Sequence, residues 1–481
     1  MKRDAQTRRE LAALSRDFTI EALATGRTQQ QMRDALERAG RLRQRLSPLQ
    51  PLLMMWLLIS MAIFRSDSIP AVLARLLTGL RDLLPKLPLK PVTEGALSHG
   101  RQRLGVRPLR EFFGAQAHEL QPDPSFHGMR VWIFDGSSLT MPDTPQNQKV
   151  FGLPKASRGR AAFPQIKFVG LQDGVSRRFR DVRFRRWDSA ERPMALGLLD
   201  HLGLGDLALM DRGFYALWFF QQILQRGAHF LARIPDSVRL KAVKGTRKSE
   251  GDYLAWIQAR VPLPNGQVRK PSGGRAAKTQ QVRLLIRVIE YHVPGFRRVR
   301  LATDLLDRDL IPALDLAHQY HGRWDIELGL DELKTHQSST SAGTLQTIFR
   351  SKTPRGVMQE AYALLAAYNL VRATIQEATR LESLRPDQIG FVDSLRAIAH
   401  MLPRMRAARA AELPGLYQQM LQDILDCRLD RPRRPRRYPR VVKVKMSNFK
   451  LKRPHHHQQI LDAAALIRIG HSAPKATPVP A

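Results

Sequence analysis

Cysteine is almost absent from this chain: among its 481 residues there is one, Cys427. A single cysteine excludes an intrachain disulfide and a cysteine-based zinc cluster, and it favours a reducing compartment. Long apolar runs are missing too. The most apolar stretch, residues 52–64, has 13 residues, whereas a helix that spans a bilayer needs about 20. We therefore expect no membrane association, a cytoplasmic location, and a buried helix over residues 52–64.

Acidic residues are scarce relative to basic ones. The chain has 43 Asp and Glu residues against 78 Lys and Arg residues, which gives a formal net charge of +35. Residues 431–453 contain eleven basic residues and no acid. Because neutralised phosphates release their bound counterions, such an excess predicts a polyanionic partner. Charge alone does not distinguish a DNA-binding protein from a structural RNA-binding protein.

Hydrophobic periodicity divides the chain into three parts. Residues 1–126 show apolar spacings of three and four, which predict a helical N-terminal domain. Residues 127–380 alternate short apolar runs with helical patterns, which predict a mixed α/β domain. Within it, residues 236–280 are rich in Lys, Arg, Gly and Ser, and we expect mobile basic loops there. Residues 381–481 are expected to form a helical region that ends in a basic arm.

Two aspartates follow apolar, strand-like runs. We expect the strand over residues 131–134 to stop at Asp135, and the strand before Asp211 to end there. Mixed α/β folds usually place ligands at such strand ends, although an aspartate there can also cap a turn or a helix. Converging carboxylates supply the oxygen ligands that Mg²⁺ requires, and two such ions can clamp a phosphodiester under attack.

A third acid is suggested by the stretch YHGRWDIELGLDELK, residues 320–334. If it forms one helix, Tyr320, Arg323, Glu327 and Lys334 share an arc of roughly 60° on its surface. Such a stripe is usually a solvated face, but it can also hold an anion and a metal. Geometry does not select Glu327, because Asp331 is almost equally well placed. Further acids near the first strands are Asp143, Asp188 and Glu191.

The spacing Y-(2)-R-(3)-E-(6)-K in this stretch resembles the signature of transposases of the insertion-sequence four family. The stretch DGSSLTMPDTPQN resembles the first-aspartate region of that family, and LMDRGF resembles its second. The similarity runs from Leu46 to Lys452. It implies an α/β fold with a ribonuclease-H-like catalytic core, a β-rich insertion at about residues 236–304, a helical N-terminal DNA-binding domain, and a helical and basic C-terminal region.

The resemblance also implies an activity and its residues. The implied reaction is metal-dependent cleavage at the ends of an insertion sequence, followed by strand transfer into target DNA. Two Mg²⁺ ions are expected, and Mn²⁺ is expected to substitute for them. The residues that the resemblance assigns to catalysis and metal binding are Asp135, Asp211 and Glu327. Those that it assigns to DNA phosphate are Tyr320, Arg323 and Lys334.

The implied partners are double-stranded DNA, as terminal inverted repeats and as target, and a second copy of the chain. A nucleoid-associated homodimer is therefore expected. A transposase-derived DNA-binding protein without catalytic activity is the alternative, and the complete set of acids favours the enzyme. A protein that only coats RNA would not need carboxylates beside phosphates. Trp256 could stack on an unpaired base, although burial within the insertion is the commoner role for a tryptophan.

Overall fold

In the computed structural model of the protein, the structure is described for residues 26–42, 49–65, 67–83, 92–156, 159–245, 251–269, 275–293, 298–323, 330, 332–333, 349–409, 411–429, 442–443, 450–451 and 467–470. The chain forms two compact units. Unit 1 comprises Met1–Asp123, Asp135–Leu198 and Asp325–Leu429, and unit 2 comprises Pro124–Phe134, Leu199–Trp324 and Asp430–Ala481. Strand β1 (Arg130–Thr140) begins in unit 2 and continues in unit 1.

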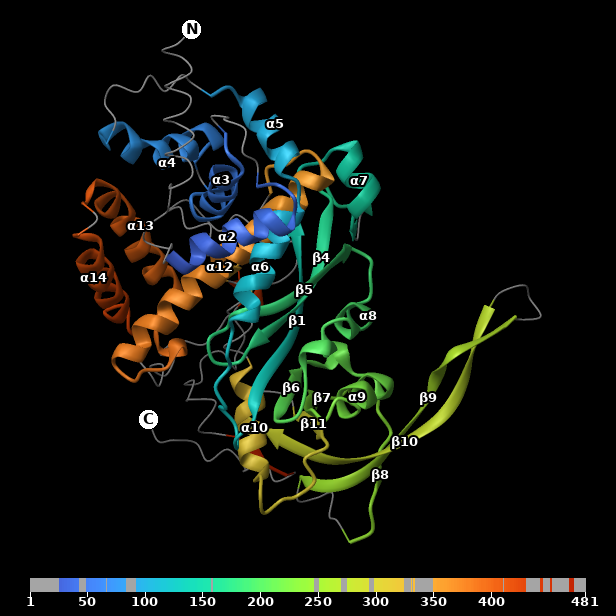
Figure 1. The fold of residues 1–481 in the computed structure, drawn as a ribbon. Helices are drawn as coiled ribbons and strands as arrows, with labels where there is room; N and C mark the ends of the chain where they lie inside the picture. The colour runs from blue at the N-terminus through green and yellow to red at the C-terminus, as the bar shows by residue number, and fades with distance from the viewer. Residues whose placement is uncertain are drawn as a thin grey trace. The chain divides into compact units, whose positions relative to one another are not determined.

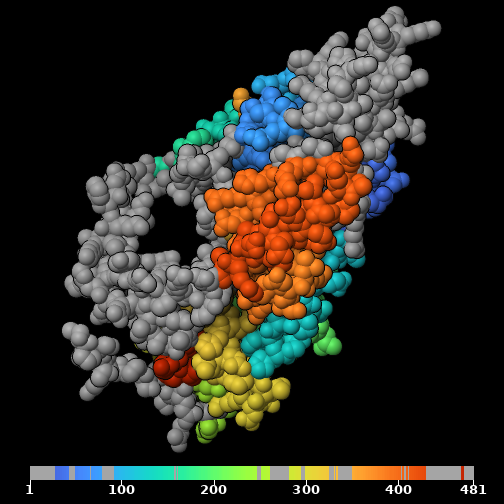
Figure 2. All heavy atoms as spheres, turned by 90° about the vertical axis from the view of Figure 1, so that its left-hand side faces the viewer, coloured from blue at the N-terminus to red at the C-terminus, as the bar shows by residue number. Residues whose placement is uncertain are grey.

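Unit 1 is built mainly from helices. They are α2 (Gly26–Arg38), α3 (Pro51–Ile63), α4 (Ile69–Leu83), α5 (Glu94–Leu104), α6 (Arg107–His118), α7 (Pro145–Phe151), α8 (Glu191–Leu196), α12 (Pro354–Leu381), the short η5 (Pro386–Gln388), α13 (Phe391–Ala407) and α14 (Leu413–Leu425). Every residue of α3 after Pro51 is buried, which confirms the buried helix expected from the apolar run. Helix α12 contacts α3 and α6, which lie beside it in Figure 1. Figure 2 shows α12, α13 and α14 forming one face of this unit, in orange.

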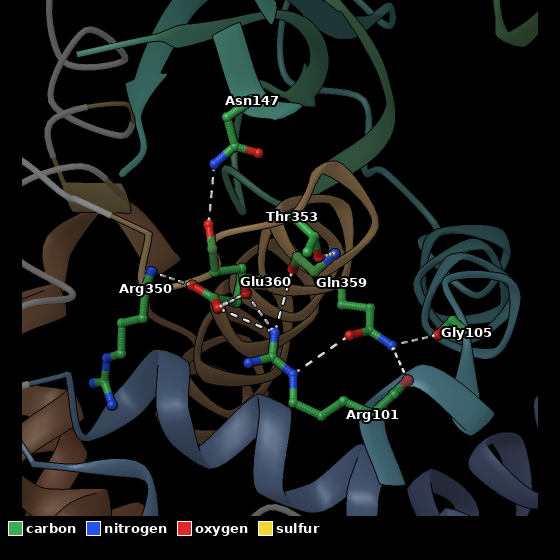
Figure 3. Close-up of polar contacts among 9 residues, drawn as sticks. Arg101, Gly105, Asn147, Arg350, Thr353, Gln359 and Glu360 are labelled. Carbon is green, nitrogen blue, oxygen red and sulfur yellow. Dashed lines mark hydrogen bonds and ion pairs between the residues drawn. The ribbon is translucent and has the colours of Figure 1, made fainter. Parts of the chain in front are cut away.

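A polar cluster joins α5 to α12 within the apolar core of unit 1 (Figure 3). The Arg101 guanidinium donates to Glu360 at 3.1 Å, and the Arg350 amide donates to the same carboxylate at 2.8 Å. The Gln359 side chain donates to two carbonyl oxygens of the α5 end, those of Arg101 and Gly105. Buried polar groups are costly unless they are paired, so these bonds fix how the N-terminal helices pack on α12.

Unit 1 also holds one edge of the β-structure. Strands β4 (Gln165–Asp173) and β5 (Phe179–Arg186) form an antiparallel pair, and the strand order is β5-β4-β1. A separate two-stranded pair is formed by β2 (Lys155–Ala156) and β3 (Gly159–Arg160). Helix α12 is tied to this edge because the Asn369 side chain accepts from the Phe179 amide at 2.8 Å and donates to the Phe179 carbonyl at 3.0 Å.

Unit 2 contains the remaining strands in the order β1-β6-β7-β11-β10-β9-β8, with β14 paired to β10. Strands β1, β6 and β7 are parallel neighbours, and the rest of the path from β7 is antiparallel. The elements are β6 (Asp206–Met210), β7 (His229–Arg233), β8 (Lys241–Ala242), β9 (Asp252–Arg269), β10 (Arg275–His292), β11 (Val299–Thr303), β12 (Val442–Lys443), β13 (Lys450–Leu451), β14 (Arg468–Ile469), η1 (Leu199–His201), η2 (Arg212–Phe214), α9 (Leu217–Leu224) and α10 (Ala313–Gly322). All five residues of β6 are buried, as expected for a strand inside a parallel sheet.

The expectation of mobile loops over residues 236–280 is wrong for most of that segment. Strands β9 and β10 instead form a long antiparallel hairpin, which Figure 1 shows reaching well beyond β8 and β11. Loops were expected because Lys, Arg, Gly and Ser are common in irregular, solvated segments. The prolines of VPLPNGQV would also disfavour a strand. Pro262 is nevertheless paired with Thr279 in the register. Strand β8 pairs with β9 only at Ala255 and Trp256, so Pro262 lies where β9 is an edge strand, which tolerates proline.

No helix in the described part of the chain combines the length and apolar character that a membrane span requires.

Candidate active site

Asp135 lies within β1, in its unit 1 part. The expectation that the strand stops at Asp135 is wrong, because β1 continues to Thr140. The apolar run ends at Phe134, but β1 still has β4 as a neighbour in the sheet, and this pairing extends the strand. The Asp135 carboxylate is half-buried and accepts a hydrogen bond from the Gly136 amide at 2.7 Å.

Asp211 follows β6 directly in unit 2, as the sequence predicted. Its carboxylate accepts from the Gly213 amide at 2.8 Å and caps η2. The parallel pairing of β1 with β6 ends at Phe134 and Met210. Each of these two paired residues is therefore followed by one of the two predicted aspartates.

The segment after α10 differs from its prediction. Helix α10 ends at Gly322, and Arg323 forms its C-terminal cap, so the single helix expected over residues 320–334 is wrong at this point. Gly322 explains the end, because glycine is the poorest helix former after proline. The proposed third ligand Glu327, its competitor Asp331 and the proposed phosphate ligand Lys334 all lie outside the described residues.

Tyr320 and Arg323 are buried in unit 2, with exposed fractions of 2% and 7%. A solvated charged face is therefore excluded for these two residues. The Arg323 guanidinium carbon lies 5.6 Å from the centre of the Tyr320 ring. Burial raises the pKa of Tyr320 above its usual value, the positive charges of Arg323 and Arg233 lower it, and the Asp211 charge raises it. These mutual effects place Tyr320 and Arg323 in one electrostatic cluster with Asp211.

Two members of this cluster were missed by the sequence analysis. Tyr291 of β10 also has a raised pKa, first because it is buried and then because of Tyr320, while Arg233 and Arg323 act in the opposite direction. Arg233 ends β7, the parallel neighbour of β6. A basic residue at the end of a buried parallel strand was a usable signal for Arg233. Nothing local in the sequence marks Tyr291.

The further acids near the first strands have different surroundings in unit 1. Asp143 accepts from the Gln148 side chain at 2.6 Å, and Asp188 pairs with Arg186 at 3.2 Å. Glu191 lies beside Gly136, the residue after Asp135. A β-carbon on Gly136 would lie 2.9 Å from the carboxyl carbon of Glu191. A glycine at position 136 therefore allows a second carboxylate to approach the backbone next to Asp135.

Trp256 lies in β9 and is half-buried. The guanidinium carbon of Arg283, on the paired strand β10, lies 3.8 Å from the centre of its ring. This distance is typical of a cation–π contact. The contact occupies one face of the ring, so only the other face is available to a further partner.

A divalent metal would need several acidic side chains as ligands. Within the described ranges, no three His, Cys, Asp or Glu side chains are grouped to hold a metal ion. The two described candidates, Asp135 and Asp211, are carboxylates that are neither fully buried nor fully exposed. Carboxylate oxygens are the donors that Mg²⁺ prefers, and partial exposure leaves room for the water ligands that it usually keeps. Each of these two carboxylates, taken by itself, has the chemistry of a ligand for such an ion.

Comparisons with known proteins show to which family the chain is similar. Residues 126–370 match the transposase DDE domain, and residues 18–114 match the N-terminal domain of insertion element 4 transposases. Over 410 residues the chain is 28% identical to the transposase InsG for insertion sequence element IS4 of Escherichia coli (strain K12), covering 84% of this chain and 86% of that protein. It also resembles a piggyBac transposase in a synaptic complex with hairpin DNA, at 11% identity and a TM-score of 0.40, covering 87% and 86%. A structural likeness this weak carries no argument.

The matched DDE domain covers about half of the chain and contains Asp135, Asp211 and the stretch with the family spacing. It implies a ribonuclease-H-like core, a DNA partner and dependence on a divalent metal. The chain belongs to the DDE transposases of the insertion-sequence four family and is a DNA transposase, a polynucleotidyl transferase.

Proposed function

We propose that Asp135, Asp211 and Glu327 together hold two Mg²⁺ ions at the scissile phosphate. One observation carries the proposal: the paired residues Phe134 and Met210 are each followed by an aspartate. The enzyme would cleave DNA at the ends of its insertion sequence and join the freed ends to target DNA. When bound, Mg²⁺ would polarise the phosphate and lower the pKa of the attacking hydroxyl group.

The basic and phenolic side chains have a separate task in this proposal. Arg323 offers its planar guanidinium to phosphate oxygens, and Lys334 adds a point charge. The raised pKa of Tyr320 keeps its hydroxyl group protonated, so it donates a hydrogen bond to phosphate. Because Tyr320 and Arg323 are buried, their interactions with a bound anion would be screened less than those of surface groups. Phosphoryl transfer depends mainly on such positioning and charge neutralisation.

We also propose that the active form is a homodimer. Transposition needs two ends to be cut and joined to one target, while each chain has one set of the three acids. We therefore place a homodimer on paired terminal inverted repeats, associated with the nucleoid. Residues 1–126 would bind DNA, residues 127–380 with the insertion at about 236–304 would catalyse, and residues 381–481 would supply helices and a basic arm.

Substitution of the proposed ligands tests the assignment. Asp135→Ala, Asp211→Ala and Glu327→Ala should each abolish cleavage of end DNA, while binding of that DNA is nearly unchanged. Asp188→Ala is the matched control, because Asp188 is an exposed acid paired only with a neighbouring arginine. Cleavage by the Glu327→Ala protein in Mg²⁺ would overturn its role, and Asp331→Ala would then be tested.

Mixed proteins test the dimer. A Glu327→Ala subunit is combined with a full-length subunit that is made defective in end binding by replacing Arg103 and Arg110, two exposed basic residues of the proposed DNA-binding domain, with glutamate. Cleavage by the mixture, but by neither protein alone, would support catalysis on the end held by the partner. Binding of both proteins to one DNA complex without any cleavage would contradict it.

A further inference from the structure

Glu332 belongs to unit 1 and lies five residues after Glu327 and two before Lys334 in the sequence. The exposed fraction of its side chain is 12%. One carboxylate oxygen accepts from Arg177 at 3.2 Å. The other accepts from the Arg372 guanidinium and from the Tyr368 hydroxyl, the latter at 3.1 Å. Three side chains from two other elements therefore converge on one carboxylate.

Arg372 and Tyr368 come from α12. Arg372 is fully buried, and its guanidinium carbon lies 5.0 Å from the centre of the Phe391 ring. Burial lowers the pKa of Arg372, but the negative charge of Glu332 and its hydrogen bonds more than offset this, and the pKa is raised. Arg372 thus keeps its positive charge inside the core of unit 1.

Arg177 comes from the turn between β4 and β5, and its backbone is unusual. Its φ angle is +61°, a left-handed conformation that non-glycine residues rarely adopt. Asp173 closes this turn by accepting from both the amide and the hydroxyl of Ser176. Such a conformation persists where the surrounding structure enforces it, and it is often found at functional sites. Here it directs a buried arginine at Glu332.

Two apolar residues lie close to Glu332 in the sequence. Leu330 and Leu333 are both buried in the apolar core of unit 1. Two apolar anchors already hold this segment in place, and an apolar residue would often replace a buried ion pair without loss of stability. Stability alone therefore does not account for the carboxylate. Its ion pairs additionally hold the Glu332 side chain in one position.

We propose that Glu332 is a positioning residue for the proposed metal ligand Glu327 and that it acts through its ion pairs with Arg177 and Arg372. This inference rests on the function proposed above for Glu327. It adds a residue to the four that the family signature contains. Misplacement of a reacting group by about 1 Å can lower a rate by roughly a hundred-fold.

The test compares cleavage in Mg²⁺ and in Mn²⁺ by the full-length Glu332→Gln protein. Glutamine keeps the size of the side chain but removes its charge. Because Mg²⁺ demands nearly ideal octahedral geometry, a displaced ligand should impair cleavage in Mg²⁺ by roughly ten- to a hundred-fold and cleavage in Mn²⁺ by less. The ratio of the two rates is independent of the fraction of folded protein, so loss of structure alone cannot change it.

Glu360→Gln is the matched control. Glu360 is also a buried carboxylate of unit 1, 9% exposed, and pairs with Arg101 (Figure 3). It lies on α12, outside the segment that carries Glu327. We expect this variant to unfold more easily while its ratio of Mg²⁺ to Mn²⁺ rates stays that of the original protein. Binding of end DNA should be retained by both variants.

Equal losses in Mg²⁺ and Mn²⁺ for Glu332→Gln would overturn the proposal. If that protein does not fold, Tyr368→Phe replaces it, since it removes one hydrogen bond to Glu332. A smaller fall in the same ratio would then support the proposal, and an unchanged ratio would overturn it. Glu327→Gln is measured in parallel. Cleavage by Glu327→Gln would refute the ligand assignment, while the ratio in Glu332→Gln would still report whether Glu332 positions a metal ligand.

Discussion

Two fully buried arginines, Arg372 in unit 1 and Arg287 in unit 2, bind their surroundings in different ways. Arg372 pairs with the Glu332 side chain, which it shares with Arg177. Arg287 forms two bonds of 2.8 Å with Asp252 and also donates to three backbone carbonyl oxygens. Those carbonyls belong to the segment that leads into α10, at Leu305, Asp307 and Ile311.

The difference separates two uses of a buried charge. The carbonyl partners of Arg287 belong to the backbone, so Arg287 holds a loop in a fixed conformation. The charged partner of Arg372 is the Glu332 carboxylate, five residues after the proposed ligand Glu327, and its Nε also donates to the Tyr368 hydroxyl at 3.3 Å. We therefore expect Arg287 to matter mainly for stability and Arg372 to matter for both stability and catalysis.

The largest effect on stability is expected for Arg287→Met. It leaves three backbone carbonyls without this donor, those of the buried residues Leu305 and Ile311 and of the exposed Asp307. It also weakens the pairing of Asp252, whose other ion-pair partner among the described residues is the more distant Arg308 side chain. Breaking a buried pair costs about 3–5 kcal/mol, and we expect the upper end of this range. Urea unfolding of the full chain measures it. Arg283→Met, an exposed arginine of the same strand, is the control and should change the free energy of unfolding by less than about 1 kcal/mol.

A smaller loss, about 3 kcal/mol, is expected for Arg372→Met, because Glu332 keeps its pair with Arg177. The comparison becomes sharper in the cleavage assay. Arg372→Met should lower the ratio of rates in Mg²⁺ and Mn²⁺, whereas Arg287→Met should leave that ratio unchanged. If both arginines shifted the ratio equally, or if Arg372→Met were the more destabilising change, the distinction between the two networks would be lost.

The elements with strong local signals were predictable from the sequence. Helix α3 was predicted from its apolar run, and Asp211 was placed at a strand end by the apolar run before it. The hairpin of β9 and β10 was not predicted, because the many Lys, Arg, Gly and Ser residues between residues 236 and 280 indicate loops, while the pairing of the two strands is not visible in the local sequence. The strand β1 was cut short for a similar reason, since its continuation depends on pairing with β4.

The buried networks could not be read from the sequence at all. Arg177, Glu332 and Arg372 lie far apart in the chain, and each looks like an ordinary surface charge in its local context. On a helical wheel, Glu332 is merely an acid near the catalytic stretch. Only tertiary packing shows that it is enclosed, because burial of a charge depends on partners that are remote in sequence.

A close backbone contact in unit 2 allows a third prediction, of intermediate size, for the free energy of unfolding. Gly251 has a φ angle of +74°, and a β-carbon there would collide with the backbone of Gly470 and lie 2.8 Å from the Glu290 carbonyl oxygen. Gly245 has a φ angle of +85° but no atom within 4 Å of such a carbon. Gly245→Ala therefore measures the cost of conformation alone, about 1–2 kcal/mol.

We expect Gly251→Ala to exceed that cost by about 1–3 kcal/mol, the usual effect of overpacking. The excess should come with loss of the pairing of β14 with β10, at Ile469 and Tyr291. Faster hydrogen exchange at the Gly470 amide, which donates to Glu290, would report this loss. Equal destabilisation by the two alanine substitutions would show that the close approach of Gly470 does not contribute.

The smallest expected effect is the dependence of stability on pH. It differs between the two units because their ion pairs use different basic residues. The ion pairs described in unit 1 use arginine, which stays charged at all ordinary pH values. Unit 2 contains the pair His229–Asp304, with 2.7 Å between the histidine Nδ1 and the carboxylate. The hydrogen bond to Asp304 raises the pKa of His229 above its usual 6.5, although burial opposes this.

Protonated His229 therefore stabilises the folded protein. Because its folded pKa is raised, this contribution is complete below about pH 6.5, the ordinary pKa of histidine, and is lost as pH rises through the folded value. His229 is more than one-third exposed, so we expect less than about 1 kcal/mol. Unfolding in urea between pH 5.5 and 8.5 measures it for the original protein and for His229→Gln. The original protein should lose stability relative to the variant as pH rises. Parallel curves for the two proteins would show that Asp304 does not favour the charged imidazole, and the pH dependence would then have to arise elsewhere in the chain.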